Sequence, residues 1–203
     1  KSNGVPEFGS EWSCSISRAG DYLLGTWLHV VTPAVSLKEG GPSLCLAWAP
    51  NFMHALVKEC AITFNDLVAA CFTGTHLDFW AAFTVPASKR VGYDNMIGNV
   101  AFLTNPTQNN TAPGAPALPS SFGGVVAPLV GPAGGTVLNL PLPLFYTRDS
   151  GVALPTAALP YNDMRINFKF RDWKQLLLKD NENGSTSQAV EADFKVVNQI
   201  SQT

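Results

Sequence analysis

The chain has 203 residues, which is enough for one domain with a substantial core. Hydrophobic residues make up 46% of it and charged residues only 14%, against roughly 25% charged in an average soluble domain. The net charge of −2 argues against nucleic-acid binding as its main task. Glycine and proline interrupt each apolar run before it reaches the roughly 20 residues that span a bilayer, so we expect no transmembrane helix.

The first part of the chain has the pattern of β-strands. Apolar and polar residues alternate in 12–17, as in a strand with one buried and one solvated face. Later stretches are aromatic or β-branched and end near Gly, Pro or Asn, which are typical strand boundaries. The strands predicted here are 12–17, 22–31, 44–48, 57–64 and 67–72.

A two-residue turn at Asn65-Asp66 is predicted to join the last two of these strands into a hairpin. If the residues next to the turn pair with each other, Cys60 lies opposite Cys71. A disulfide would be strained in this geometry, so we expect two reduced thiols on the core face. A Cys60–Cys71 bond is the alternative. With Cys14 and Cys45, all four cysteines are expected to be free thiols.

The pattern becomes helical after residue 74. Thr75-His76-Leu77-Asp78 has the spacing of a capping box and is followed by apolar residues at helical intervals. Pro86 ends this short helix, and a second helix is predicted for 87–96, with Gly98 placed to end it. The stretch 105–135 is rich in Pro and Gly without apolar periodicity, which predicts a long loop.

The second half returns to β-structure. The stretch 136–146 has strand character but contains Pro141 and Pro143, which favour an edge or a bend. Apolar and polar residues alternate strictly in 164–171, which predicts a strand with one buried face. A polar loop at 181–187 leads to a final predicted strand at 192–196. The core is expected to contain Trp12, Ile16, Ile62, Phe64, Ile166 and Phe168.

These elements predict an all-β fold rather than an α/β fold. The expected architecture is a jelly-roll β-sandwich with two short helices inserted in one connection and long loops. We expect residues 1–203 to form a single jelly-roll domain that includes the long loop at about 105–135.

The sequence contains none of the common catalytic or nucleotide-binding motifs. The cysteines form no C-x-x-C, and His29, His54 and His76 fall on separate predicted elements, so we expect no metal site. Lys58 and Cys60 would share one face of a strand, but a structural cysteine is favoured over an activated thiol. We therefore expect no catalytic residue and no cofactor.

No Asp, Glu, Lys, Arg or His occurs from Asn95 to Thr147. A solvated loop normally carries charges, and a membrane segment would not contain this many Pro, Gly and Asn residues. Two interpretations stay open: a surface covered by neighbouring protein, or a flexible loop of neutral composition. Under the first, the candidate assembly surface consists of Val125, Leu129, Leu138 and Leu142.

Several blocks of the sequence are similar, almost position for position, to one family of viral proteins. The blocks are 17–24, 51–54, 58–70, 77–84, 93–99, 140–143, 148–155 and 160–166. They lie between about residue 9 and about residue 173. They resemble the major capsid proteins of iridoviruses and related large double-stranded DNA viruses.

The resemblance implies a structural protein of the virion, assembled in the host cytoplasm. In that family the chain carries two jelly rolls, and three chains form a pseudo-hexagonal capsomer that tiles an icosahedral shell around an internal membrane. The implied partners are further copies of the chain, as a homotrimer and a capsomer lattice, with minor capsid proteins and the internal membrane layer, and no direct nucleic acid.

The resemblance also implies that this chain is the first jelly roll, with the second one C-terminal to it in the full-length protein. The alternative function is a jelly-roll carbohydrate-binding or host-attachment module. Such a module would need an exposed cleft of aromatic and polar side chains.

Overall fold

The computed structural model of the chain describes residues 2–3, 5–31, 35–36, 45–104, 125–126, 137–159, 161–180 and 186–188. Its strands are β1 (Ser2–Asn3), β2 (Glu11–Ser15), β3 (Tyr22–Leu23), β4 (Trp27–Val31), β5 (Val35–Ser36), β6 (Cys45–Trp48), β7 (Val57–Phe64), β8 (Leu67–Thr73), β9 (Val125–Val126), β10 (Val137–Pro141), β11 (Leu154–Pro155), β12 (Met164–Phe170), β13 (Leu177–Asp180) and β14 (Thr186–Gln188). Its α-helices are α1 (Phe52–Leu56), α2 (Gly74–Thr84), α3 (Ala87–Ile97) and α4 (Ala101–Thr104). Short 3₁₀ helices lie at Phe145–Thr147, Ser150–Val152, Thr156–Ala158 and Trp173–Gln175.

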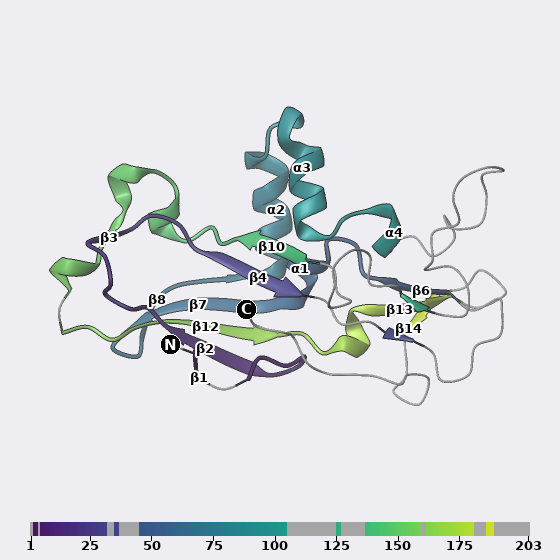
Figure 1. Cartoon of the computed structure of the whole chain (residues 1–203), viewed down its shortest axis with the longest axis horizontal. Helices are drawn as coiled ribbons and strands as arrows, with labels where there is room; N and C mark the ends of the chain where they lie inside the picture. Colours follow the sequence, from purple (N-terminus) through teal and green to yellow (C-terminus); the bar gives the residue numbers. More distant parts are fainter. Residues whose placement is uncertain are drawn as a thin grey trace.

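A five-stranded antiparallel sheet in the order β1-β2-β12-β7-β8 forms one layer (Figure 1). β12 lies at its centre and alternates between buried and half-buried residues along its whole length. Met164, Ile166, Phe168 and Phe170 enter the core, which confirms the predicted alternation. The ring of Trp12 on β2 stacks on Phe168 with 5.5 Å between ring centroids.

The antiparallel ribbon of β4 and β10 lies across the core from this sheet (Figure 1). Leu28 and Val30 from β4 and Leu138 and Leu140 from β10 are buried. Among the residues predicted for the core, Ile62, Ile166 and Phe168 are buried, whereas Trp12, Ile16 and Phe64 are half-buried and packed against it. The two layers therefore enclose one apolar core, as in a β-sandwich.

The turn of the β7–β8 hairpin is the predicted Asn65-Asp66. Both residues have positive φ angles, 49° and 67°, as the central residues of a type I′ turn require. Asn and Asp tolerate this conformation better than most residues. The turn also lies against the end of β12, because the Asn65 backbone N–H donates to the carbonyl of Asp163 at 2.9 Å.

The observed hairpin differs from the predicted one in its register, which shifts between Ile62 and Thr63. One extra residue on β8 places Cys71 opposite Ala61, so the predicted Cys60–Cys71 pairing is wrong. Because neighbouring positions on a strand face opposite sides, the one-residue shift leaves Cys60 buried and Cys71 exposed. Cys14, Cys60 and Cys71 are free thiols, and the side chain of Cys45 lies outside the described residues.

The predicted pair of helices is present as α2 and α3, which stand out from the sandwich (Figure 1). α3 is followed by Gly98 at φ 84°, as predicted for a left-handed C-cap. The predicted capping box is absent, because α2 begins one residue before Thr75 and Asp78 bonds instead to Asn51 and His54. The short helices α1 and α4 were not predicted, since four or five residues carry too little periodicity.

Several predicted boundaries differ from the structure. The predicted strand 22–31 is divided into β3 and β4, which pair with β11 and β10. β13 was not predicted, and β14 begins inside the predicted polar loop 181–187. β13 pairs with β6 on one side and with β14 on the other. The predicted strand 192–196 and most of the predicted loop 105–135 lie outside the described residues.

Candidate assembly surface

Two of the residues predicted for an assembly surface are core residues. Leu138 leaves only 1% of its surface exposed, so predicting it as a contact residue was wrong, whereas Leu142, which is 2% exposed, lines a cavity and stays a candidate contact. Alternation along β10 turns Leu138 inward, and Leu142 continues the same pattern just beyond the strand. Val125 lies in β9, which pairs with β5, but its side chain and the whole of Leu129 lie outside the described residues.

Part of the charge-free segment 95–147 builds the core. Ile97, Leu103, Leu140 and Leu144 are all buried. An unpaired charge at such positions would lose its hydration without compensation, which excludes charged residues. In the described part of this segment, core packing therefore accounts for much of the missing charge.

The outward face of the β4–β10 ribbon is open to solvent and apolar at both ends. Trp27 and Val137 leave 58% and 52% of their surface exposed, and Pro141 pairs with Trp27 across the ribbon. Between them, His29 Nδ1 and Asn139 Oδ1 form a hydrogen bond of 2.7 Å. An apolar strand face of this kind is favourable only when something covers it.

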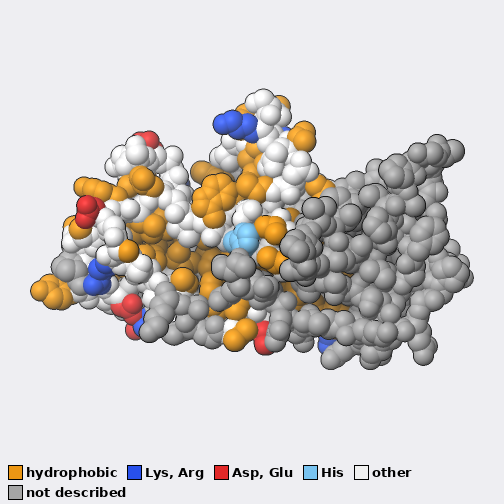
Figure 2. All heavy atoms as spheres, viewed as in Figure 1, with side chains coloured by type: hydrophobic (Ala, Val, Ile, Leu, Met, Phe, Trp, Pro, Cys, Tyr) orange, Lys and Arg blue, Asp and Glu red, His pale blue; other side chains and the backbone are white. Residues whose placement is uncertain are grey.

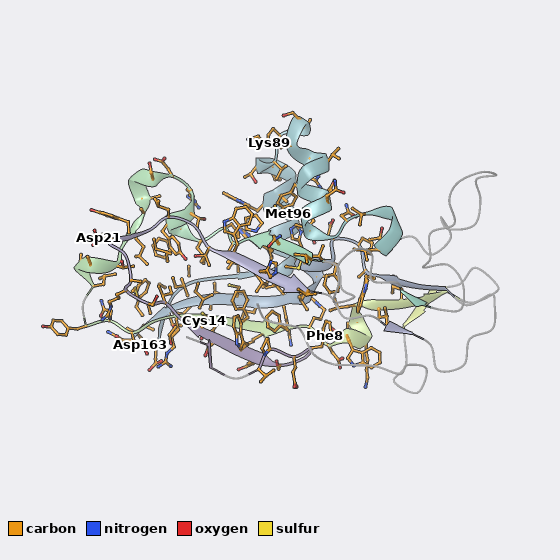
Figure 3. All side chains as sticks on the ribbon, viewed as in Figure 1. Phe8, Cys14, Asp21, Lys89, Met96 and Asp163 are labelled. Atoms are coloured by element: carbon orange, nitrogen blue, oxygen red, sulfur yellow. The ribbon has the colours of Figure 1, made fainter. Side chains whose placement is uncertain are left out.

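Helices α2 and α3 form a wall beside this face. A cavity of about 740 Å³ lies between wall and ribbon, lined among others by Trp80 and Met96 from the helices, by Trp27 from the ribbon and by Pro143, which follows β10. Met96 lies near the base of the helical hairpin and Lys89 near its tip (Figure 3). We call this cavity, together with the outward residues Trp27 and Val137, the apolar groove.

Charged groups lie at the edge of the apolar groove. The guanidinium of Arg148 stands 5.6 Å from the centre of the Trp80 ring, in a cation–π contact. Figure 2 shows hydrophobic side chains gathered between the helices and the loops at the opposite end of the ribbon, with few charged atoms among them. A partner could therefore cover this face without burying many charges.

The outer side of the helical hairpin is apolar as well. α2 buries Leu77 and Ala81, whereas Phe79 and Phe83 remain largely exposed, with 4.7 Å between their ring centroids. Val91 on α3 is also exposed. Contiguous exposed apolar side chains of this kind are typical of interaction surfaces.

A further apolar projection lies at the end of the sandwich, beside the β7–β8 turn. Tyr161 is 95% exposed and Leu67 is largely exposed. The Asn65 side chain fixes this end by donating from Nδ2 to Oδ1 of Asn162 at 2.8 Å. The projection is therefore held in place by polar contacts while its apolar side chains face solvent.

The hairpin cysteines lack the chemistry of a nucleophile. Burial raises the pKa of the Cys60 thiol, and the nearby Cys71 and Glu59 raise it further. The pKa of Cys71 is also raised, by partial burial and by Glu59, to whose Oε1 its thiol donates at 3.6 Å. Since the thiolate is the reactive form, these shifts lower the fraction of each thiol that can act as a nucleophile near neutral pH. The described residues also contain no group of three or more His, Cys, Asp and Glu side chains placed to hold a metal ion.

The apolar groove was not predicted from the sequence, although a signal was present. The segments 27–31 and 137–141 carry apolar residues at both odd and even positions. Whichever face enters the core, apolar residues remain on the other face, and such strands are normally covered on both sides. Among the described helices, none is long and apolar enough to cross a bilayer.

Comparison with known proteins identifies the family. The family described as "Major capsid protein N-terminus" matches residues 1–201. The major capsid protein of Invertebrate iridescent virus 6 is 57% identical over 193 residues, which cover 94% of this chain and 38% of that protein. That of Costelytra zealandica iridescent virus is 59% identical over 182 residues, which cover 89% and 36%. The chain thus spans little more than a third of the length of these relatives.

The structural comparison agrees with the sequence relatives. The Faustovirus major capsid protein aligns with a TM-score of 0.64 and 16% identity, over 87% of this chain and 42% of that one. At this identity the likeness shows the fold alone, and it confirms the predicted jelly-roll sandwich. Because the family match covers almost the whole chain and the iridovirus relatives share more than half of the aligned residues, the chain belongs to the major capsid protein family, whose N-terminal part it represents.

Proposed function

We propose that this chain is the first jelly roll of a shell-forming capsid protein. Three copies of the full-length protein form a pseudo-hexagonal capsomer, and capsomers tile an icosahedral shell. The major capsid proteins of related iridoviruses support this role. In the same proposal, a second jelly roll follows in the full-length chain, and no residue of this chain is catalytic.

The apolar groove is the observation that carries the proposal. Burying apolar surface stabilises an interface by roughly 25 cal/mol per Å², and tryptophan is among the residues that contribute most to binding. Trp27 and Trp80 both line the groove, and Trp27 is more than half exposed. Among the described residues that line the cavity only Lys89 is charged, and it lies near the tip of the hairpin, so covering the groove strips water from few charges.

The remaining partners follow from the place of the chain in a virion. Minor capsid proteins and an internal membrane layer lie inside the shell, which is assembled in the host cytoplasm. Val125, Leu129 and Leu142 stay candidate contacts in the charge-free segment, and the groove residues Trp27 and Val137 are added to them in place of Leu138.

The test replaces Trp27 by Asp in the full-length protein. A charge at a buried contact is expected to weaken trimer formation at least ~30-fold, because a central interface residue contributes about 2 kcal/mol or more. Native mass spectrometry and sedimentation measure trimers and shells, and circular dichroism checks folding.

Val5→Asp is the matched control. Val5 is also an exposed apolar residue, but it does not line the groove. The control protein should form trimers at the parental concentration. Parental assembly by a folded Trp27→Asp protein would show that copies do not meet through the groove.

A further inference from the structure

A buried histidine joins three helices at the base of the helical hairpin. His54 on α1 is 1% exposed, and both ring nitrogens are hydrogen-bonded. Nδ1 lies 2.7 Å from Oδ1 of Asp78 on α2, and Nε2 lies 2.8 Å from the hydroxyl of Tyr93 on α3. Asn51, which precedes α1, donates from Nδ2 to the same Asp78 oxygen at 3.0 Å. The cluster therefore ties α2 and α3 to the sandwich through α1.

The partners determine where the protons lie. The Asp78 carboxylate can only accept, so Nδ1 of His54 carries a proton and donates it. The neutral ring then accepts at Nε2, and the Tyr93 hydroxyl donates to it. Burial raises the pKa of Tyr93 to about 12, so the hydroxyl keeps its proton at physiological pH. The arrangement is complete only with a neutral imidazole.

The start of α2 lies in close backbone contact with the end of α1. At Gly74, the first residue of α2, a Cβ atom would lie 2.2 Å from the carbonyl oxygen of His54 and 2.6 Å from that of Val57. The two helices therefore meet backbone to backbone. Tightly packed contacts of this kind pass between distinct docked and undocked arrangements rather than deforming continuously.

We propose that His54 is a pH-sensitive latch, which holds the α2–α3 hairpin on the sandwich when neutral and releases it when protonated. A second N–H, on Nε2, would face the Tyr93 O–H. The hydroxyl must then turn to accept, and its own proton loses its partner. The new positive charge would also lie in a site with almost no access to water.

The charged groups around His54 oppose one another. Asp78 on α2 favours the protonated ring, while Arg90 on α3 disfavours it and is paired with Asp94 at 3.4 Å. Arg171, after β12, donates from Nε to the carbonyl of Ala55 and lines the polar cavity next to the ring. Burial is the largest influence and lowers the pKa of His54 below its ordinary value of 6.5.

The direction of the pH dependence follows from this lowered pKa. The undocked hairpin exposes His54 to water, where it takes a proton below about pH 6.5. The docked state keeps the neutral ring to lower pH. Docking is therefore most stable above pH 6.5 and weakens as the pH falls from there toward the lowered pKa. Because α2 and α3 form one wall of the apolar groove, the latch also controls the shape of that surface.

Hydrogen exchange on the full-length protein at pH 7.5 and pH 5.5 tests the latch. After correction for the intrinsic pH dependence of exchange, the equilibrium constant for opening of 74–97 should be larger at pH 5.5 than at pH 7.5. The increase can reach about tenfold, which is the limit for one group with a reference pKa of 6.5. Opening of β12 should not change. In His54→Gln the increase should disappear, whereas His76→Gln, an exposed histidine on α2, should retain it.

Exchange of the imidazole C2 proton, followed by mass spectrometry, measures the pKa of His54 without any substitution. A value below 6.5 together with opening of the hairpin at low pH supports the latch. A value of 6.5 or higher, an unchanged 74–97 segment at pH 5.5, or an undiminished increase in a folded His54→Gln protein would each overturn it. These readouts do not depend on trimer formation, so they are independent of the proposed assembly role.

Discussion

The strand β12 and the β4–β10 ribbon bury similar inward faces but differ on their outward faces. Outward from β12, Lys169 forms ion pairs with Glu59 at 3.2 Å and with Glu11 at 3.8 Å. Outward from the ribbon, Trp27 and Val137 are exposed apolar residues. The charged face is suited to water, whereas the apolar face is suited to a protein partner.

Alternation therefore predicts which face is buried within the chain, whereas the chemistry of the other face indicates what that face meets. In β12 the two faces differ clearly in polarity, so the sequence alone is sufficient. In the ribbon apolar residues lie on both faces, and an inward leucine such as Leu138 cannot be distinguished by sequence from a contact residue. The incorrect assignment of Leu138 to a surface arose from this ambiguity.

The largest expected effect is on the inward face of β12. Phe168→Ala should reduce the free energy of unfolding by roughly 3–5 kcal/mol, because it removes a ring that stacks on Trp12 and Phe170 in the core. Urea denaturation followed by circular dichroism measures the change. A loss below about 1 kcal/mol would mean that this face of β12 is not the packed one.

Substitutions at two neighbouring residues of β10 compare the stability contributed by the two faces of the ribbon. Leu138→Ala should cost about 2–5 kcal/mol, since the side chain is buried. Val137→Ala, at the adjacent outward position, should change stability by about 0.5 kcal/mol or less. Urea titrations of both variants test this, and similar losses at the two positions would show that the outward face is packed within the chain itself.

Much of the fold could be predicted because local patterns agreed with tertiary structure. The alternation in 164–171, the Asn65-Asp66 turn and the left-handed Gly98 are each determined by residue type and spacing. The bulge in β8 could not be predicted, because it depends on how the hairpin joins the wider sheet. One extra residue was enough to separate Cys60 from Cys71.

The candidate site was less predictable than the fold. The apolar groove brings together Trp27, Trp80 and Pro143, which are far apart in the sequence and meet only because the helical hairpin stands beside the ribbon. In the His54 cluster, likewise, His54 and Tyr93 are hydrogen-bonded although they are 39 positions apart. Neither site has a local motif, since both arise from packing between elements.

The hairpin cysteines offer a test of the corrected register. In the native protein, a thiol reagent should modify the exposed Cys71 readily, although its raised pKa slows the reaction. Cys60 should react only when the hairpin opens, because it is buried. Peptide mapping by mass spectrometry distinguishes the two. Equal labelling of both in the folded protein would contradict the shifted register.

Titration of the denatured protein tests the redox state of the same cysteines. Under non-reducing conditions four thiols should react, which includes Cys45. Fewer than four would indicate a disulfide. Since the shifted register places Cys60 and Cys71 on opposite faces, such a bond would have to involve another pair.

The smallest expected effect is on the outward face of β12. The neighbouring carboxylates raise the pKa of Lys169, through the hydrogen bond that its amine donates to Glu59 and then through the charges of Glu59 and Glu11, so the amine is charged at all physiological pH values. Even so, Lys169→Met should leave the urea midpoint almost unchanged, because ion pairs at an exposed surface are weakened by water and by salt. Repeating the titration in 1 M sodium chloride should reduce the difference between the two urea midpoints still further. A large loss at low salt that high salt abolishes would contradict this prediction, because it would mean that the ion pairs themselves stabilise the sheet.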